Sequence, residues 1–185
     1  GEVLAVEAAD LNADGVIDLM VLAADGTVRR LSRDLEADEW SIHEVVSSEG
    51  VPDDAAPGSV ELIVQDYDNN GQLDILRATG EGARLWLGTP ERTFRRLPID
   101  IAADIQSAAD LTDDGRLDLV GRSSEGEPVQ LTNSGDKDYG WYLARPRAAT
   151  TTGDQRINSF GVGGEIEMRA GLQYQKQVIG SPQVH

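Results

Sequence analysis

The apolar residues of this chain occur in short runs that acidic or glycine-containing segments separate. The runs VLAVEA, VELIV and IQSAA each precede an acidic segment, and DLMVLA, DILRA and DLVGR each follow one. These runs are short, β-prone and without helix caps, so they predict strands rather than helices. The turn signals Asp25-Gly26, Gly80-Glu81-Gly82 and Glu125-Gly126 then predict reversals into third strands, TVRRLS, ARLWLG and PVQLTN.

The acidic segments belong to an internal repeat. The three nine-residue windows are Asp10-Leu-Asn-Ala-Asp-Gly-Val-Ile-Asp18, Asp66-Tyr-Asp-Asn-Asn-Gly-Gln-Leu-Asp74 and Asp110-Leu-Thr-Asp-Asp-Gly-Arg-Leu-Asp118. Without gaps, all three share Gly at the sixth position, an aliphatic residue at the eighth and Asp at the ninth, and a Gly and a Leu recur further on. The windows begin 56 and then 44 residues apart, and the extra 12 residues of the first interval include the apparent loop insertion DDAAPGS.

Each repeat unit predicts a strand, an acidic loop, a strand, a tight turn and a strand. The segments WSIHEVV and TFRRLPI add a fourth strand to the first two units. Four antiparallel strands in a unit of this length are typical of a β-propeller blade. The fold class predicted is therefore all-β, with three blades and a small C-terminal β-hairpin module. Three blades do not close a ring, so we expect them to belong to a larger ring, since Gly1 opens directly into a strand, rather than to an open stack.

Composition narrows the function classes. The formal net charge is −17, and such an acidic surface disfavours binding to nucleic acid or to anionic membranes. There is no cysteine, so disulfides, thiolate zinc sites and cysteine catalysis are excluded. The chain contains neither an apolar run long enough to insert in a membrane nor a signal-peptide pattern at its start.

The charge also indicates a domain boundary near Tyr139. Residues 1–138 contain 30 acidic and 11 basic side chains, whereas residues 139–185 contain 3 acidic and 5 basic ones. We therefore predict a propeller segment over 1–138 and a separate β module over 139–185.

The acidic windows suit a hard cation that binds oxygen ligands. Oxygens at positions one, three, five and nine, together with the backbone carbonyl at position seven, can converge on one ion, and Gly at position six allows the sharp turn. An all-oxygen set with three carboxylates per loop favours Ca²⁺ over zinc or copper, so about three calcium sites are predicted. The expected ligands are Asp10, Asn12, Asp14, Val16 and Asp18 in the first loop, Asp66, Asp68, Asn70, Gln72 and Asp74 in the second, and Asp110, Thr112, Asp114, Arg116 and Asp118 in the third.

Two other interpretations of these loops are disfavoured. An EF-hand requires a closing Glu at position twelve at the start of a helix, but Val21, Arg77 and Gly121 occupy that position. Asp, Asn and Gly also suit tight turns that hold no metal, although three windows in register disfavour that alternative. Asp113 is a surplus carboxylate that we expect to face solvent.

The windows and their flanks resemble FG-GAP/VCBS repeats, the blades of integrin-α-like propellers, whose Asp-rich loops bind Ca²⁺. The segment from Asn158 to Ile166, followed by EIEMR and QYQKQV around the turn Ala170-Gly171, resembles the ASPIC/UnbV domain that often follows such repeats. That family usually continues past its His with Phe-Gly-Leu-Gly, whereas this chain ends at His185, so we expect its last strand to be missing or disordered. The resemblance implies an extracellular, periplasmic or cell-surface location.

Other candidate residues point to no catalytic centre. His43 and His185 are far apart in sequence, and no nucleophile elbow, phosphate loop or zinc helix motif is present. His43 is expected to face outward from a strand, and the glycines at 161, 163 and 164 fit hairpin geometry better than a dinucleotide site. Trp40, Trp86, Trp141 and Tyr142 can stack on sugars, but packing is the preferred interpretation. Asp53-Asp54 and Arg145-Pro146-Arg147 are expected to be solvated.

The sequence thus predicts a non-enzymatic, calcium-stabilised propeller segment of an exported or cell-surface binding or adhesion protein, for which a protein and a glycan partner are both open. Two alternatives remain open. One is a carbohydrate-active enzyme or glycan-binding module with an acidic cleft framed by the propeller. The other is an internal spacer with no ligand besides metal.

Overall fold

The computed structural model describes residues 1–47, 51–52, 54–135, 140–141, 144, 146–147, 160–171 and 173–179. Its regular secondary structure in these residues consists entirely of strands, which confirms the predicted all-β class. The strands are β1 (Val3–Ala9), β2 (Asp18–Ala23), β3 (Val28–Asp34), β4 (Glu39–Val46), β5 (Val60–Gln65), β6 (Asp74–Thr79), β7 (Gly82–Gly88), β8 (Phe94–Arg96), β9 (Asp104–Ala109), β10 (Asp118–Arg122), β11 (Pro128–Leu131), β12 (Glu165–Ala170) and β13 (Gln173–Val178).

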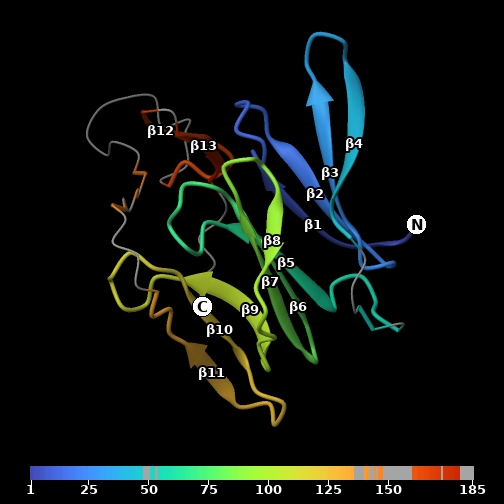
Figure 1. Cartoon of the computed structure of the whole chain (residues 1–185), viewed down its shortest axis with the longest axis vertical. Helices are drawn as coiled ribbons and strands as arrows, with labels where there is room; N and C mark the ends of the chain where they lie inside the picture. The colour runs from blue at the N-terminus through green and yellow to red at the C-terminus, as the bar shows by residue number, and fades with distance from the viewer. Residues whose placement is uncertain are drawn as a thin grey trace.

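The strands form antiparallel sheets that follow the chain order, and none of the sheets closes on itself. Sheet 1 has the order β1-β2-β3-β4, sheet 2 has β5-β6-β7-β8, and sheet 3 has β11-β10-β9. The hairpin β12-β13 makes a small separate sheet, and β13 packs against β1. Figure 1 shows sheet 2 in the middle of the molecule, with sheet 1 and sheet 3 on either side.

Local sequence explains the hairpins. Gly26 and Gly126 follow the acidic turn residues and adopt φ of 79° and 83°, which the missing β-carbon permits. The fourth strand predicted in the first unit is present as β4, whereas in the second unit it shortens to the three residues of β8. The predicted C-terminal hairpin is β12-β13, with Gly171 in the turn at φ 63°.

Two hydrophobic cores hold the three sheets together. The first lies between sheet 1 and sheet 2 and includes Met20, Leu22, Leu62 and Ile75. The second joins sheet 2 to sheet 3 and includes Leu76, Leu85, Ile105 and Leu119. Sheet 2 is therefore covered on both faces, and all six residues of β6 are buried. This explains why β6 lacks the alternation of apolar and polar residues that a half-exposed strand shows.

The two residues that follow the closing Asp of each loop face opposite sides of their sheet, and each repeat position faces the same side in successive sheets. Ile75 and Leu119 share one position of the repeat, and each faces the preceding sheet. Met20 and Leu76 share the next position, and each faces the following sheet. Neighbouring strand residues point to opposite faces, so the two internal interfaces use equivalent surfaces of successive sheets.

The corresponding first face of sheet 1 is open, and we call it the open face. It contains Leu19, the equivalent of Ile75, together with the register neighbours Val6, Val21, Leu31 and Ile42. Val6 is 54% exposed and Ile42 is 65% exposed, although the matching faces of sheets 2 and 3 are packed. Arg29 and Glu44 lie on the same face, so the exposed apolar side chains are bordered by charged ones.

Candidate metal centre

The three acidic loops connect the first strand of each sheet to the second, and they share one backbone conformation. The fourth residue is left-handed in every loop, with φ of 54° at Ala13, 55° at Asn69 and 58° at Asp113. The glycine at position six has φ of 86°, 84° and 80° in the same order. The sequence repeat is thus also a repeat of geometry.

Hydrogen bonds to the first Asp fold each loop around its carboxylate. Asp66 accepts the N–H groups of Asn70 and Gly71 at 3.1 and 2.8 Å. Asp10 and Asp110 accept from the equivalent two N–H groups of their loops at 2.9 to 3.1 Å. Each carboxylate oxygen has two lone pairs, so these bonds leave acceptor capacity for a cation.

The ninth residue of each window is an Asp whose side chain is fully buried at the start of the second strand. Asp74 accepts the N–H groups of Tyr67 and Gly88, both at 2.7 Å. Asp118 accepts those of Leu111 and Asn133 at 3.3 and 2.9 Å. These bonds tie the loop to the end of the third strand, so the closing Asp fixes all three strands at one point.

Asp18, the closing residue of the first loop, lacks such partners. Its two oxygens are buried without a well-formed hydrogen bond, and Arg30 Nε lies 3.9 Å from Oδ2. Burial raises the pKa of Asp18, while the nearby Ser32 hydroxyl and the Arg30 charge oppose that increase. A buried carboxylate with so little compensation favours protonation or the approach of a positive charge.

The second loop assembles the acidic group best suited to a metal ion. Among the described residues, Asp66, Asp68 and Asp74 bring three carboxylate oxygens within 4.8 Å of one another. Oxygens that share one Ca²⁺ at about 2.3–2.6 Å lie at such mutual distances, so these three residues can hold a metal ion. Burial raises the pKa of Asp66 to about 6 and that of Asp74 to about 7, with further contributions from neighbouring aspartates.

The first and third loops have an Asp at position five, whereas the second loop has Asn70 there. In both of these loops another side chain of the loop donates to that Asp. In the first loop, Asn12 donates to Asp14 Oδ2 at 2.7 Å. In the third loop, Arg116 donates to Asp114 Oδ2 at 2.8 Å, and the Arg116 backbone N–H and side chain hold the pKa of Asp114 below its ordinary value. The predicted ligand oxygens of these loops are thus partly engaged by donors of the chain itself.

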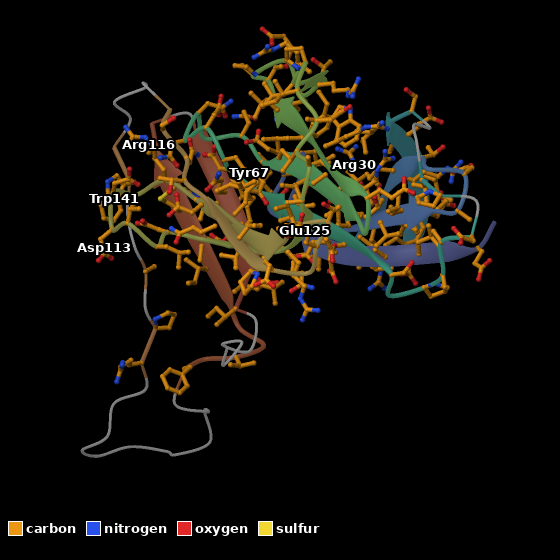
Figure 2. All side chains as sticks on the ribbon, turned by 90° about the horizontal axis from the view of Figure 1, so that it is seen from below. Arg30, Tyr67, Asp113, Arg116, Glu125 and Trp141 are labelled. Carbon is orange, nitrogen blue, oxygen red and sulfur yellow. The ribbon has the colours of Figure 1, made fainter. Side chains whose placement is uncertain are left out.

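Several contacts around the loops were absent from the sequence prediction. Asn69 of the second loop donates to the Gly115 carbonyl of the third at 2.9 Å. The Trp141 indole lies directly against Gly115, where any β-carbon would collide with it. Figure 2 shows Trp141, Asp113 and Arg116 at the same edge of the molecule. The repeat pattern carries no signal for these contacts, because the residues that contact Gly115, Asn69 and Trp141, lie outside the shared positions.

The remaining candidates have the following positions. His43 is exposed on β4, as predicted, and Asp113, Asp54 and Arg147 are also exposed. Trp86 is buried in the first core, which confirms the packing interpretation, whereas Trp40 and Trp141 are about half exposed. Asp53, Tyr142, Arg145, Asn158 and His185 lie outside the described residues.

A cavity of about 220 Å³ near the turn between β6 and β7 contains carboxylates outside the loops. Glu81 and Asp100 line it together with Arg77 and Arg84. Arg96 and Arg84 contact Asp100 at 2.6 and 3.3 Å, and they hold the pKa of Asp100 below its ordinary value. A general acid requires a raised pKa, so the electrostatics of Asp100 do not support that role.

Comparison with protein-family models and with curated proteins gives no match for this chain. Within the described residues, no helix is long and apolar enough to cross a membrane.

Proposed function

We propose that this chain is a calcium-stabilised segment of β-propeller blades in an exported or cell-surface protein that binds a protein or glycan partner. The observation that carries the proposal is the group Asp66, Asp68 and Asp74, which the repeated loop brings together at the junction of three strands of sheet 2. The calcium ion is structural in this proposal, because it compensates buried carboxylates and links the first strand of a sheet to the second and third.

The equivalent loops extend the proposal to about three sites. All three loops share their left-handed residues and the hydrogen bonds to the first Asp. We expect the second loop to bind Ca²⁺ most tightly, because Asn12 and Arg116 engage the position-five carboxylates of the other two. The resemblance to FG-GAP/VCBS repeats supports blades as the structural unit and an environment rich in Ca²⁺ as the location.

Calorimetry and thermal unfolding of the full chain test the metal claim. We expect saturable Ca²⁺ binding, and a higher melting temperature in excess Ca²⁺ than in chelator. A ligand present at one hundred times its dissociation constant adds about 2.7 kcal/mol to the free energy of unfolding. Absence of both effects would contradict the proposal.

Asp68→Asn locates the tightest site. The variant removes one carboxylate of the group while leaving an oxygen that can accept the Asn70 N–H, now bonded to Asp68 at 3.2 Å. We expect it to weaken the tightest binding step at least tenfold. Asp113→Asn is the matched control, because it removes the same charge from an exposed loop position and should leave binding unchanged.

A further inference from the structure

Alternate residues of the second acidic loop have different partners. Asp66 and Asp68 belong to the group of carboxylates that can hold a metal ion. Tyr67 and Asn69, which alternate with them, contact sheet 3 instead. The Tyr67 side chain is 4% exposed and packs in the second core, between sheet 2 and sheet 3. One short segment therefore provides both carboxylates for an ion and contacts to the neighbouring sheet.

Asn133, which follows β11 in sheet 3, binds the backbone of this loop. Its Nδ2 donates to the Tyr67 carbonyl at 2.9 Å, and its backbone N–H donates to Asp118 Oδ1 at 2.9 Å. The Tyr67 carbonyl belongs to the peptide group that joins Tyr67 to Asp68. On its other side, the Tyr67 N–H donates to Asp74 Oδ2 at 2.7 Å. Both peptide groups of Tyr67 are therefore fixed, one by sheet 3 and one by a member of the acidic group.

A second hydrogen bond joins the acidic loops of sheets 2 and 3. Asn69 Nδ2 donates to the Gly115 carbonyl at 2.9 Å, and Asn69 itself has the left-handed φ of 55°. This bond is made in the same loop conformation that brings the three carboxylates within 4.8 Å of one another. Contact with sheet 3 and cation binding therefore favour the same state of the second loop.

The other two loops lack this combination. Ala13 in the first loop and Asp113 in the third occupy the position of Asn69, and neither an alanine nor an ionised aspartate side chain can donate a hydrogen bond. Leu111, the equivalent of Tyr67 in the third loop, is 49% exposed. Among the described residues, the three converging carboxylates belong to the second loop. The loop that bonds to the following sheet through position four is thus the loop whose carboxylates converge.

We propose that a cation in the second loop and the packing of sheet 3 against sheet 2 stabilise each other, with Asn133 as the residue that couples them. This inference rests on the proposed function, because it requires that the second loop bind a cation. Linkage is reciprocal, so the factor by which the packing of sheet 3 raises the cation affinity equals the factor by which the cation favours that packing. The cation concentration then regulates how firmly sheet 3 is held.

Ca²⁺ titration calorimetry of the full chain tests the coupling at the tightest binding step, which Asp68→Asn assigns to the second loop. Asn133→Ala removes the side-chain bond to the Tyr67 carbonyl but keeps the backbone N–H that donates to Asp118. We expect this variant to weaken the tightest step by about fivefold or more, the lower end of typical coupling between sites. Thr132→Ala is the matched control, because Thr132 is exposed in the same segment and its loss should not change the affinity.

Hydrogen exchange supplies a second readout that does not depend on the Asn133 variant folding. At a Ca²⁺ concentration that fills the tightest step, the amides of β9 and β10 in the parent chain should exchange more slowly than in chelator. The same Ca²⁺ concentration should not slow their exchange in Asp68→Asn, because that variant lacks the tightest step.

The outcomes separate this inference from the proposed function. Absence of Ca²⁺ binding by the parent chain would overturn both together. Binding at the second loop with no effect of Ca²⁺ on the exchange of β9 and β10 would overturn this inference alone, as would an affinity that Asn133→Ala leaves unchanged.

Discussion

The glycines at position six of the acidic loops have two separate roles, which Gly115 illustrates. Its φ of 80° is left-handed, and its α-carbon is covered by the Trp141 ring. Gly126 has a similar φ of 83°, but nothing lies within 4 Å of the position that its β-carbon would take. Comparing Gly115 with Gly126 therefore separates the effect of a left-handed backbone from the effect of contact with the Trp141 ring.

We predict that Gly115→Ala destabilises the protein more than Gly126→Ala. Both variants incur the left-handed penalty of about 1–2 kcal/mol, but Gly115→Ala must also displace Trp141. Chemical unfolding measures the difference, and a shift in tryptophan emission in the Gly115 variant reports the displaced ring. Equal destabilisation of the two variants would show that Trp141 does not pack against the loop in solution.

The raised pKa values in the second loop determine whether the free energy of unfolding rises or falls with pH. With pKa values of about 6 for Asp66 and about 7 for Asp74, the folded, cation-free protein keeps protons that the unfolded chain releases near pH 4. The unfolded state therefore binds fewer protons in this window. The free energy of unfolding should fall as the pH rises from about 4 to about 7.

Urea unfolding in chelator at several pH values measures this slope. Excess Ca²⁺ should reduce the loss at neutral pH, because the ion compensates the same ionised carboxylates. Stability that rises over this window in chelator would contradict the assignment of Asp66 and Asp74 as the dominant titrating groups.

At the scale of the element, β6 is unusual because it combines complete burial with a charged residue. Arg77 is 2% exposed, and its Nη1 donates to the Gly26 carbonyl of sheet 1 at 3.0 Å. Its guanidinium also lies 5.2 Å from the centre of the Trp86 ring. The side chain therefore links the turn of one sheet to the central strand of the next.

We predict that Arg77→Met destabilises the protein by about 1–3 kcal/mol, because the variant keeps most of the packing volume but loses a buried hydrogen bond. Arg84→Met on β7 is the control: Arg84 is partly exposed, and its partner Asp100 retains Arg96 at 2.6 Å. The control should cost less than about 1 kcal/mol. Thermal unfolding in Ca²⁺ compares the two, and equal losses would indicate that Arg77 does not link the sheets.

The elements were also the level at which the sequence was most informative. The short β-prone runs and the Asp-Gly and Glu-Gly turns predicted the hairpins of all three larger sheets, because strand and turn preferences are local. The shortening of β8 and the burial of Arg77 were not predictable in the same way, since both depend on the neighbouring sheet. The hydrogen bond that Lys176 Nζ donates to the Gly15 carbonyl escaped prediction, because no local pattern relates a loop to a distant hairpin.

For the candidate site, spacing identified which residues share a loop but not which carboxylates converge. Asp66, Asp68 and Asp74 form a group, whereas Asn12 and Arg116 alter the other two loops through their own donors. The prediction used only the backbone carbonyl at position seven, so it did not account for the Arg116 side chain. The side-chain donors that engage loop carboxylates therefore distinguish three loops that the sequence repeat alone predicts to be equivalent.

At the scale of the whole molecule, the open face of sheet 1 exposes apolar side chains, among them Val6 and Ile42, whereas the matching faces of the other sheets are packed. We predict that the chain self-associates through it as concentration rises, and that Val6→Lys with Ile42→Lys weakens this association. Leu35→Lys is the control, because Leu35 is 66% exposed in the turn after β3 and lies off this face. Sedimentation at increasing concentration measures the effect, and equal behaviour of the two variants would contradict a role for the open face.

The equivalence of the two internal interfaces has a consequence for how such a protein can change length. Leu119 contacts sheet 2 from the same repeat position from which Ile75 contacts sheet 1. Each sheet therefore presents the same kind of aliphatic surface to the sheet that follows it. A duplicated copy of the middle unit, placed between sheets 2 and 3, would present an aliphatic surface to each neighbour without new side chains. The architecture therefore permits growth by whole-unit duplication, in which most of the energetic cost falls on the connecting segments rather than on the cores.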